Sequence, residues 1–153
     1  MDERAYWQRI GERYGEALGE SLVAVAVFGS RARGAAAPDS DHDVLLIAAG
    51  LPDEPFERAR RVRLPLLDLG AMQVQVLART PAEFTADVTG LHLDLALDAL
   101  VVRERDGWLS SRLARLRELI ETAGLERGPN LFWRWRKPPR GPDWAITWEG
   151  VRT

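Results

Sequence analysis

The sequence predicts an α+β fold, a small mixed β-sheet flanked by helices. Three short apolar segments, at 22–28, 43–49 and 71–78, are typical of buried strands. Segments with helical spacing of apolar residues separate them, and a late run of helices favours α+β over a large parallel sheet. The 153 residues, 46% of them hydrophobic, suit one domain, which we expect to span 1–153.

In the N-terminal half, the spacing of apolar residues and the residues that cap or break helices predict the elements. Residues 3–19 fit an amphipathic helix that Asp2 can cap. The Val-rich strand at 22–28 ends at Gly29. A second helix is expected from Glu54 toward Leu64, where Pro65 ends or kinks it. The core of the domain is expected to cover about 20–85.

The C-terminal half, about 91–153, is expected to be a helical and hairpin extension. Thr80-Pro81-Ala82-Glu83 forms a capping box that begins a helix. Another helix is predicted at 91–100, and a third begins at Ser110 or Ser111 and closes at Gly124. In the Trp-rich tail, 132–136 and 144–149 are expected to pair as a hairpin.

Composition and charge exclude several classes of protein. The net charge of −2 makes nucleic acid an unlikely partner, because duplex binding needs a basic surface. No run of about 20 apolar residues predicts a membrane span. The absence of cysteine excludes disulfides and thiolate metal sites. The charged N-terminal segment is unlike a signal peptide, so a cytoplasmic location is expected.

A Gly-Ser turn after the first strand is a candidate phosphate-binding site. Gly29 allows the backbone to approach a ligand closely, because it has no Cβ. Ser30 offers a hydroxyl and lies at the start of a predicted helix, where backbone N–H groups attract phosphate. Arg31 and Arg33 add positive charge beside it. A Gly-Ser pair after a strand is common, so the turn alone is a weak signal.

Two carboxylates open the second strand. Asp41 and Asp43 are two residues apart, so their side chains point the same way, whereas His42 points to the opposite face and is expected to be structural. Like charges this close repel unless a proton or a cation intervenes. Mg²⁺ is the expected cation because it prefers oxygen ligands, and Mn²⁺ is an alternative.

Gly29-Ser30 followed by Asp41-x-Asp43, with apolar strands on both sides, resembles the minimal nucleotidyltransferases of the DNA polymerase β-like superfamily. The resemblance implies a nucleotidyltransferase fold in which the Gly-Ser turn holds a nucleoside triphosphate, with ATP expected. Asp41 and Asp43 would bind Mg²⁺ as a nucleoside monophosphate passes to a protein or small-molecule hydroxyl. It also implies a second possibility, an antitoxin-like protein that binds a small helical partner of the HEPN class.

Members of that family usually carry a third carboxylate on a neighbouring strand, where this chain has Gln75. Glutamine can bind a metal but cannot accept a proton at neutral pH. Three outcomes remain open: a slow enzyme, an enzyme that uses a different acid, or a nucleotide-binding protein that acts by protein contact. The acids considered are Asp68, Glu83, Asp94 and Asp98. Asp94 and Asp98 also fit an ordinary helix face, and Asp68 fits a turn.

Four of the six tryptophans lie in the tail, at Trp133, Trp135, Trp144 and Trp148. Basic residues alternate with them at 132–136. A hairpin that covers apolar surface is the simplest interpretation, while a protein interface and nucleic-acid contact are the alternatives.

Overall fold

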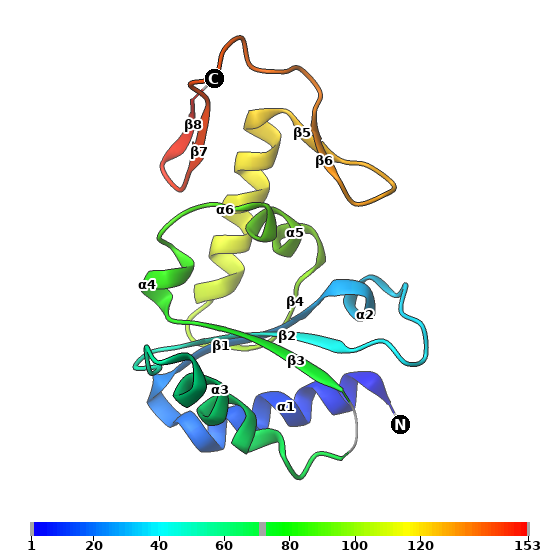
Figure 1. Ribbon diagram of the computed structural model, residues 1–153, viewed down its shortest axis with the longest axis vertical. Coiled ribbons are helices and arrows are strands. Elements are labelled where there is room, and N and C mark those ends of the chain that lie inside the picture. The colour runs from blue at the N-terminus through cyan, green and yellow to red at the C-terminus, as the bar shows by residue number, and fades with distance from the viewer. Residues whose placement is uncertain (1, 71–72, 153) are drawn as a thin grey trace.

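A computed structural model describes residues 2–70 and 73–152, and its centre is one four-stranded sheet in the order β3-β2-β1-β4 (Figure 1). β1 runs antiparallel to both β2 and β4, whereas β2 and β3 are parallel. The predicted mixed sheet is therefore confirmed. The strands are β1 Leu22–Phe28, β2 His42–Ala48, β3 Val74–Arg79 and β4 Leu100–Glu104.

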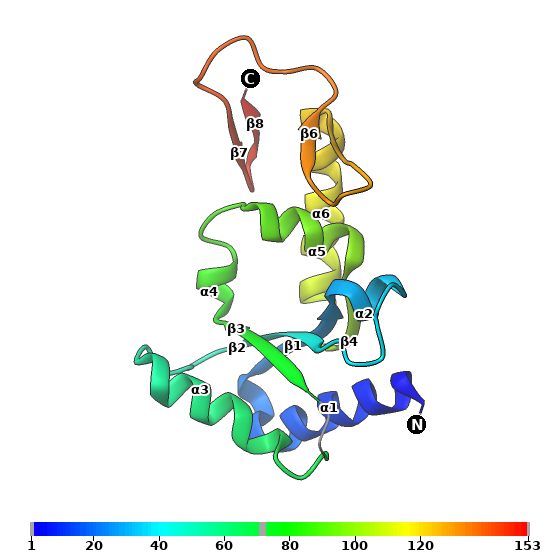
Figure 2. The same ribbon diagram turned by 45° about the vertical axis from the view of Figure 1, so that its right-hand side comes forward.

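Helices cover both faces of the sheet, with α1 and α3 on one side and α5 and α6 on the other (Figures 1 and 2). The longer helices are α1 Glu3–Leu18, α3 Pro55–Arg63, α5 Gly90–Asp98 and α6 Trp108–Ala123; the shorter ones are α2 Gly29–Arg33 and α4 Pro81–Phe84, with 3₁₀ turns at Gly19–Ser21 and Leu64–Leu66. Among the described residues, none of the helices combines the length and the apolarity needed to cross a membrane.

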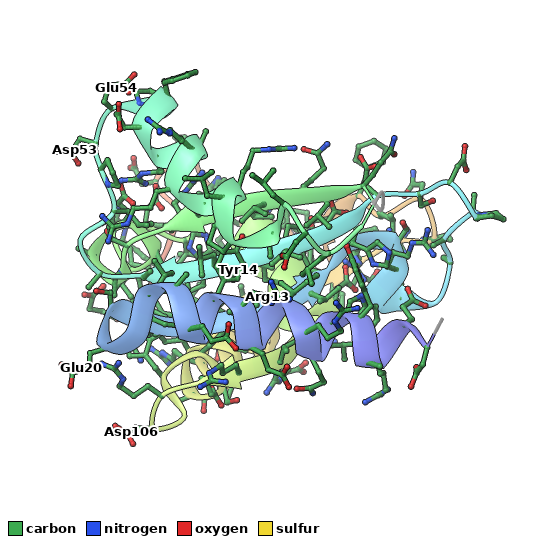
Figure 3. All side chains as sticks on the ribbon, turned by 90° about the horizontal axis from the view of Figure 1, so that it is seen from below. Arg13, Tyr14, Glu20, Asp53, Glu54 and Asp106 are labelled. Atoms are coloured by element: carbon green, nitrogen blue, oxygen red, sulfur yellow. The ribbon has the colours of Figure 1, made fainter. Side chains whose placement is uncertain are left out.

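Helix α1 forms where the apolar spacing predicts it. The Asp2 side chain accepts a hydrogen bond from the backbone N of Arg4 at 3.1 Å, which satisfies one free N–H at the helix start. The buried residues Tyr6, Ile10 and Tyr14 face the sheet. The Tyr14 hydroxyl donates to the Val62 carbonyl at 2.8 Å and so joins α1 to α3, both of which lie in front of the sheet in Figure 3.

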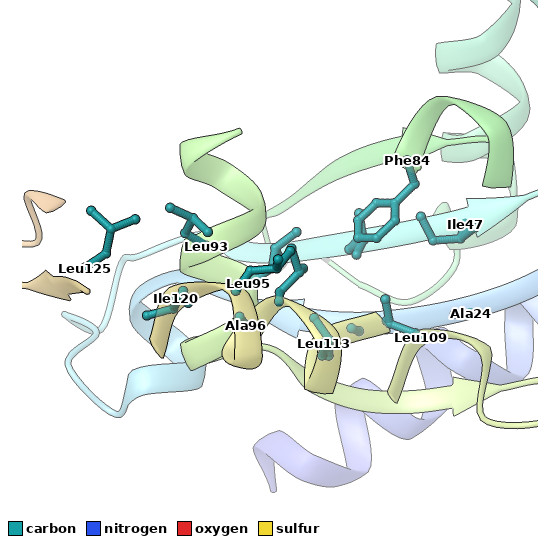
Figure 4. Close-up of a cluster of buried hydrophobic side chains, with 14 of the residues drawn as sticks. Ala24, Ile47, Phe84, Leu93, Leu95, Ala96, Leu109, Leu113, Ile120 and Leu125 are labelled. Carbon is teal, nitrogen blue, oxygen red and sulfur yellow. The ribbon is translucent and has the colours of Figure 1, made fainter. Parts of the chain in front are cut away.

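β1 and β2 are buried on both faces, as their continuous apolar sequences predict. Alternate residues of each strand face opposite layers. Val25 and Leu46 pack toward α1, whereas Ala24 and Ile47 pack toward α5 and α6. Figure 4 shows the second of these clusters, in which leucines of α5 and α6 meet the sheet. This double burial holds the ends of β1 and β2 rigidly.

The segment after α5 differs from the prediction of a helix at 91–100. The helix is α5, Gly90–Asp98, and the chain then forms β4, which pairs with β1. The predicted helix therefore ended two residues too late, and the fourth strand was missed. β4 is only partly buried, so its pattern lacks the continuous apolar run that marked the other strands.

Helix α6 begins at Trp108, earlier than the serine caps predict. Asp106 and Gly107 both have positive φ, at 51° and 67°, and form a turn there. The carboxylate of Glu104 accepts from the backbone N atoms of Leu109 and Ser110 at 3.0 and 2.8 Å. Glu104 of β4 therefore caps the N-terminus of α6, the role that was predicted for Ser110 or Ser111.

The tail forms two hairpins instead of the one predicted. β5 Leu125–Arg127 pairs with β6 Trp133–Trp135, and β7 Ala145–Thr147 pairs with β8 Gly150–Arg152. The predicted pairing of 132–136 with 144–149 is wrong, although the rings of Trp135 and Trp144 meet edge to face at 5.2 Å. Trp133, Trp135 and Trp148 pack against the α5–α6 core, as the apolar-cover interpretation predicts.

Two further sequence predictions fall close to the observed elements. The capping box at Thr80 and Glu83 is present, with both reciprocal hydrogen bonds. The strand predicted at 71–78 is observed as β3, Val74–Arg79; residues 71–72 lie outside the described residues.

Candidate functional site

Three of the predicted site residues meet across the sheet because of strand register. Asp43 of β2 lies opposite Phe28, the last residue of β1, and beside Gln75 of β3. Gly29 follows Phe28 directly. The antiparallel pairing of β1 with β2 and the parallel pairing of β2 with β3 therefore bring the turn, the carboxylate and the glutamine into one row.

Gly29 touches Asp43 so closely that only glycine fits. Its φ is +73°, in the left-handed region that other residues rarely adopt, and a Cβ there would lie 2.1 Å from Oδ2 of Asp43. The turn from β1 into α2 therefore passes directly over the Asp43 carboxylate. Ser30 follows, half-buried, and its carbonyl accepts from the backbone N of Ala35 at 2.9 Å.

The two carboxylates form an oxygen-rich pair, with Gln75 beside them. Asp41 and Asp43 are half-buried, and Nε2 of Gln75 donates to Oδ2 of Asp41 at 3.2 Å. Burial raises the pKa of Asp43, and the facing charge of Asp41 raises it further, while Arg33 lowers it. Opposed carboxylates of this kind fit a hard divalent cation, which removes their repulsion.

A third acidic ligand is absent from the described part of the chain. Within residues 2–70 and 73–152, no three side chains of His, Cys, Asp or Glu converge in a way that could hold a metal ion. Gln75 occupies the place on β3 beside Asp43, as the spacing from the capping box predicts.

The two arginines of α2 have different partners. Arg31 donates from Nε and Nη2 to the Ser40 carbonyl, at 3.1 and 2.7 Å, and from Nη2 to the Pro38 carbonyl at 3.1 Å. It therefore holds the loop that leads to Asp41. Arg33 makes one hydrogen bond, from Nη1 to Oδ2 of Asp98 at 3.0 Å. From the sequence, both arginines were expected to add positive charge beside the Gly-Ser turn. In the structure Arg31 holds the loop by hydrogen bonds, whereas the charge of Arg33 lowers the pKa of Asp43.

His42 lies on the opposite face from the carboxylates, as the alternation predicts. It is 1% exposed, and its Nδ1 accepts from Nε1 of Trp7 at 3.0 Å, while the Tyr6 ring packs beside it. Burial lowers the pKa of His42, and the nearby Arg31 lowers it further. The buried, neutral imidazole therefore packs between β2 and α1.

Each acid considered as a substitute for the third carboxylate is paired with an arginine. Asp68 pairs with Arg13, and Glu83 pairs with Arg58 at 2.8 Å. Arg127 holds both Asp94 and Asp98, at 3.1 and 2.7 Å. Arg127 was not among the residues that the sequence singled out; the i,i+4 spacing of Asp94 and Asp98 was visible, but their partner lies about thirty residues further on.

A cavity of about 380 Å³ lies on the same face of the sheet as the carboxylates. Leu45 and Leu77 line it, and these residues come two positions after Asp43 and Gln75 on β2 and β3. Because alternate strand residues share a face, the cavity adjoins the row of site residues. Phe84, His92 and Asp87 close its far side.

The chain is similar to a known protein family and to individual known proteins. A family model described as the nucleotidyltransferase domain matches residues 6–111. A protein of Methanocaldococcus jannaschii, named "Putative protein adenylyltransferase MJ1305", is 25% identical over 108 residues, which are 68% of this chain and 74% of that protein.

Two solved structures are similar at a TM-score of 0.50 each. One is a toxin-antitoxin with AMP-PNP, 14% identical, and the other is a mutant of the toxin-antitoxin MntA-HpeT, 12% identical. In both cases the match covers 74% of this chain and 86% of the other. At these identities the likeness establishes a shared fold.

Proposed function

The chain belongs to the nucleotidyltransferase domain family, and on that premise we propose that it transfers a nucleoside monophosphate from a nucleoside triphosphate to a hydroxyl group and releases pyrophosphate. ATP is the expected donor. The contact between Gly29 and Asp43 is the observation that carries the proposal. It places the start of α2, where the first backbone N–H groups have no partner within the helix, against a pair of carboxylates. A metal-bound phosphate chain requires this combination.

Asp41 and Asp43 would hold Mg²⁺, or Mn²⁺ in its place. When bound, such an ion stabilises the negative charge that develops on the phosphoryl group during transfer. Burial is the larger cause of the raised pKa of Asp43, and repulsion by Asp41 is the second. The repulsion supports this assignment, since a cation between the carboxylates would relieve it.

The protein's own groups would bind and orient the donor. Gly29 and Ser30 present backbone N–H groups to the phosphates without steric hindrance, and Arg33 adds a guanidinium that is 25% exposed. Arg31, which we also considered for phosphate, acts through the loop that it holds to Ser40.

Slow turnover is part of the proposal. A general base typically contributes a factor of about 10²–10⁴ in rate, and the Gln75 amide cannot serve as one. The four acids considered as replacements, Asp68, Glu83, Asp94 and Asp98, are all paired with arginines, so the proton of the acceptor hydroxyl would pass to solvent.

The acceptor is proposed to be a single side chain or a small molecule. The cavity beside Gln75 supports this, because about 380 Å³ suits one small group and is too small for a nucleic-acid strand. The name of the archaeal relative favours a protein hydroxyl. A Leu77→Trp variant, which would reduce the cavity, should lower transfer and leave ATP binding intact; loss of ATP binding instead would assign the cavity to the nucleoside.

Transfer can be tested with ATP labelled on the α-phosphorus, incubated with the protein, cell extract and Mg²⁺ or Mn²⁺. A labelled acceptor that depends on the added protein is expected, and ATP labelled on the γ-phosphorus should give no labelling that depends on the protein. The label should be lost in Asp43→Asn. Asp53→Asn is the matched control, because Asp53 is exposed and far from the site (Figure 3). No labelled acceptor with either metal would contradict the proposal.

A second function, binding of a small helical HEPN-class partner as an antitoxin, is favoured by the same Gln75. The exposed aromatic residues Phe132, 73% exposed, and Trp144, 46% exposed, offer a contact surface. Asp43→Asn would then neutralise the partner as well as the wild type does. A protein that stays monomeric when mixed with the product of the adjacent gene would count against this function.

A further inference from the structure

A network of charged side chains joins α2, which is proposed to bind phosphate, to the β5–β6 hairpin. It begins at Arg33 of α2, passes through Asp98 and Asp94 of α5, and ends at Arg127 of β5 and Trp133 of β6. These segments are far apart in the sequence. The network therefore connects the candidate nucleotide site to a part of the chain that has no other role in it.

Asp98 is the centre of the network and holds two guanidinium groups unequally. Its side chain is only 5% exposed. Arg127 binds it through two hydrogen bonds, from Nη2 to Oδ1 at 2.7 Å and from Nη1 to Oδ2 at 2.8 Å. Arg33 binds it through one, at 3.0 Å. Arg127 is the stronger partner, because two-point contacts between guanidinium and carboxylate are the most favourable.

Arg127 is itself fixed from the other side. Its Nη1 also donates to Oδ1 of Asp94 at 3.1 Å, and the same oxygen accepts from Nε1 of Trp133 at 2.9 Å. The β5–β6 hairpin thus holds Arg127 in place. Burial alone would raise the pKa of Asp98, but the hydrogen bonds from Arg127 and Arg33 outweigh it and lower the pKa, so Asp98 is ionised.

We propose that Arg127 neutralises Asp98 and thereby weakens the hold of Asp98 on Arg33, so that Arg33 can exchange its single hydrogen bond for the triphosphate. Asp98 and Arg127 are then positioning residues for nucleotide binding, and the β5–β6 hairpin controls the site through them. The inference rests on the proposed function. Its physical basis is competition between the two arginines for Asp98. Without Arg127, Asp98 would bind Arg33 more strongly, because a buried charge without a partner is costly.

The proposal predicts a rescue that a purely structural role does not. Arg127→Met should weaken binding of ATP with Mg²⁺ by about tenfold, measured by isothermal titration calorimetry, because Asp98 then binds Arg33 more strongly. Adding Asp98→Asn to that variant should restore most of the affinity. The matched control is Arg134→Met, which removes an exposed ion pair with Glu126 from the same hairpin and should bind ATP normally.

Several results would overturn the inference. Arg127→Met that binds ATP as well as the wild type contradicts it, as does a double variant no better than Arg127→Met. If Arg127→Met melts at the assay temperature, Asp98→Asn alone decides: release of Arg33 should tighten ATP binding about threefold, and weaker binding contradicts the proposal. A wild-type protein that binds no ATP would instead overturn the proposed function on which this rests.

Discussion

The Asp43 carboxylate lies where a side chain at Gly29 would begin, 2.1 Å from the position of a Cβ. We therefore expect Gly29→Ala to displace either the turn or the carboxylate. The left-handed φ of +73° adds about 1–2 kcal/mol of backbone strain for any other residue. Urea unfolding should show this loss of stability, and binding of ATP with Mg²⁺ should fall below detection.

Gly34 provides the matched control for that variant. It has the same φ of +73°, but a Cβ there would meet no atom within 4 Å. Gly34→Ala should lose a similar free energy of unfolding and still bind ATP. Equal loss of binding in both variants would show that strain in α2, not the contact with Asp43, is responsible.

Asp43 is expected to titrate above an ordinary aspartate in the metal-free protein. Burial is the larger cause and the charge of Asp41 the second. Because the folded-state pKa is raised, ionisation of Asp43 costs stability as the pH rises through that pKa. Carbon-detected NMR titration should give a midpoint for Asp43 above the ordinary aspartate value of 3.8. Asp41→Asn should lower the Asp43 midpoint in part; an unchanged midpoint would show that the two carboxylates do not interact.

Glu83 should contribute to stability at pH values above its ordinary pKa and lose that contribution in acid. Its hydrogen bonds with Arg58, and then with the Thr80 backbone, lower its pKa to about 2 from an ordinary 4.5. The contribution is therefore complete above the ordinary value and is lost as the pH falls toward 2.

Glu83→Gln should lower the free energy of unfolding by about 1 kcal/mol or less at pH 7, since the carboxylate is partly exposed. Urea unfolding across pH 7 to 2 should show the wild type and the variant converging at the acidic end. Glu149→Gln, at an exposed position, is the matched control for the removal of one surface carboxylate. A constant difference at every pH would contradict the assignment.

Gln75→Glu should restore the third carboxylate and make the site depend more strongly on metal. Without metal, the new charge would face Asp41, whose Oδ2 now accepts from the Gln75 amide, and the protein should be less stable. Added Mg²⁺ should raise the melting temperature more than in the wild type. The rate of label transfer should rise by about 10²-fold if the missing base limits turnover. Equal stabilisation by Mg²⁺ in both proteins would argue against a metal at this position.

Local sequence signals predicted most elements of the fold but not all of their partners. The Val-rich run of β1 and the capping box at Thr80 specify their own structure, because burial pattern and capping depend on neighbouring residues. β4 was missed because its strand character depends on pairing with β1. The tail pairing was wrong for the same reason: several short aromatic segments can pair, and only the packed structure selects the neighbours.

The sequence by itself determined the family, the Gly-Ser turn, the order of the two aspartates, and the presence of Gln75 where a carboxylate is usual. Only the tertiary structure decided that Gly29 touches Asp43, that Arg31 braces a loop, and that Asp98 is shared between Arg33 and Arg127. The physical reason is range. Motif spacing is a property of adjacent residues, whereas strand register and ion pairing bring together side chains whose separation in the sequence carries no sign of contact.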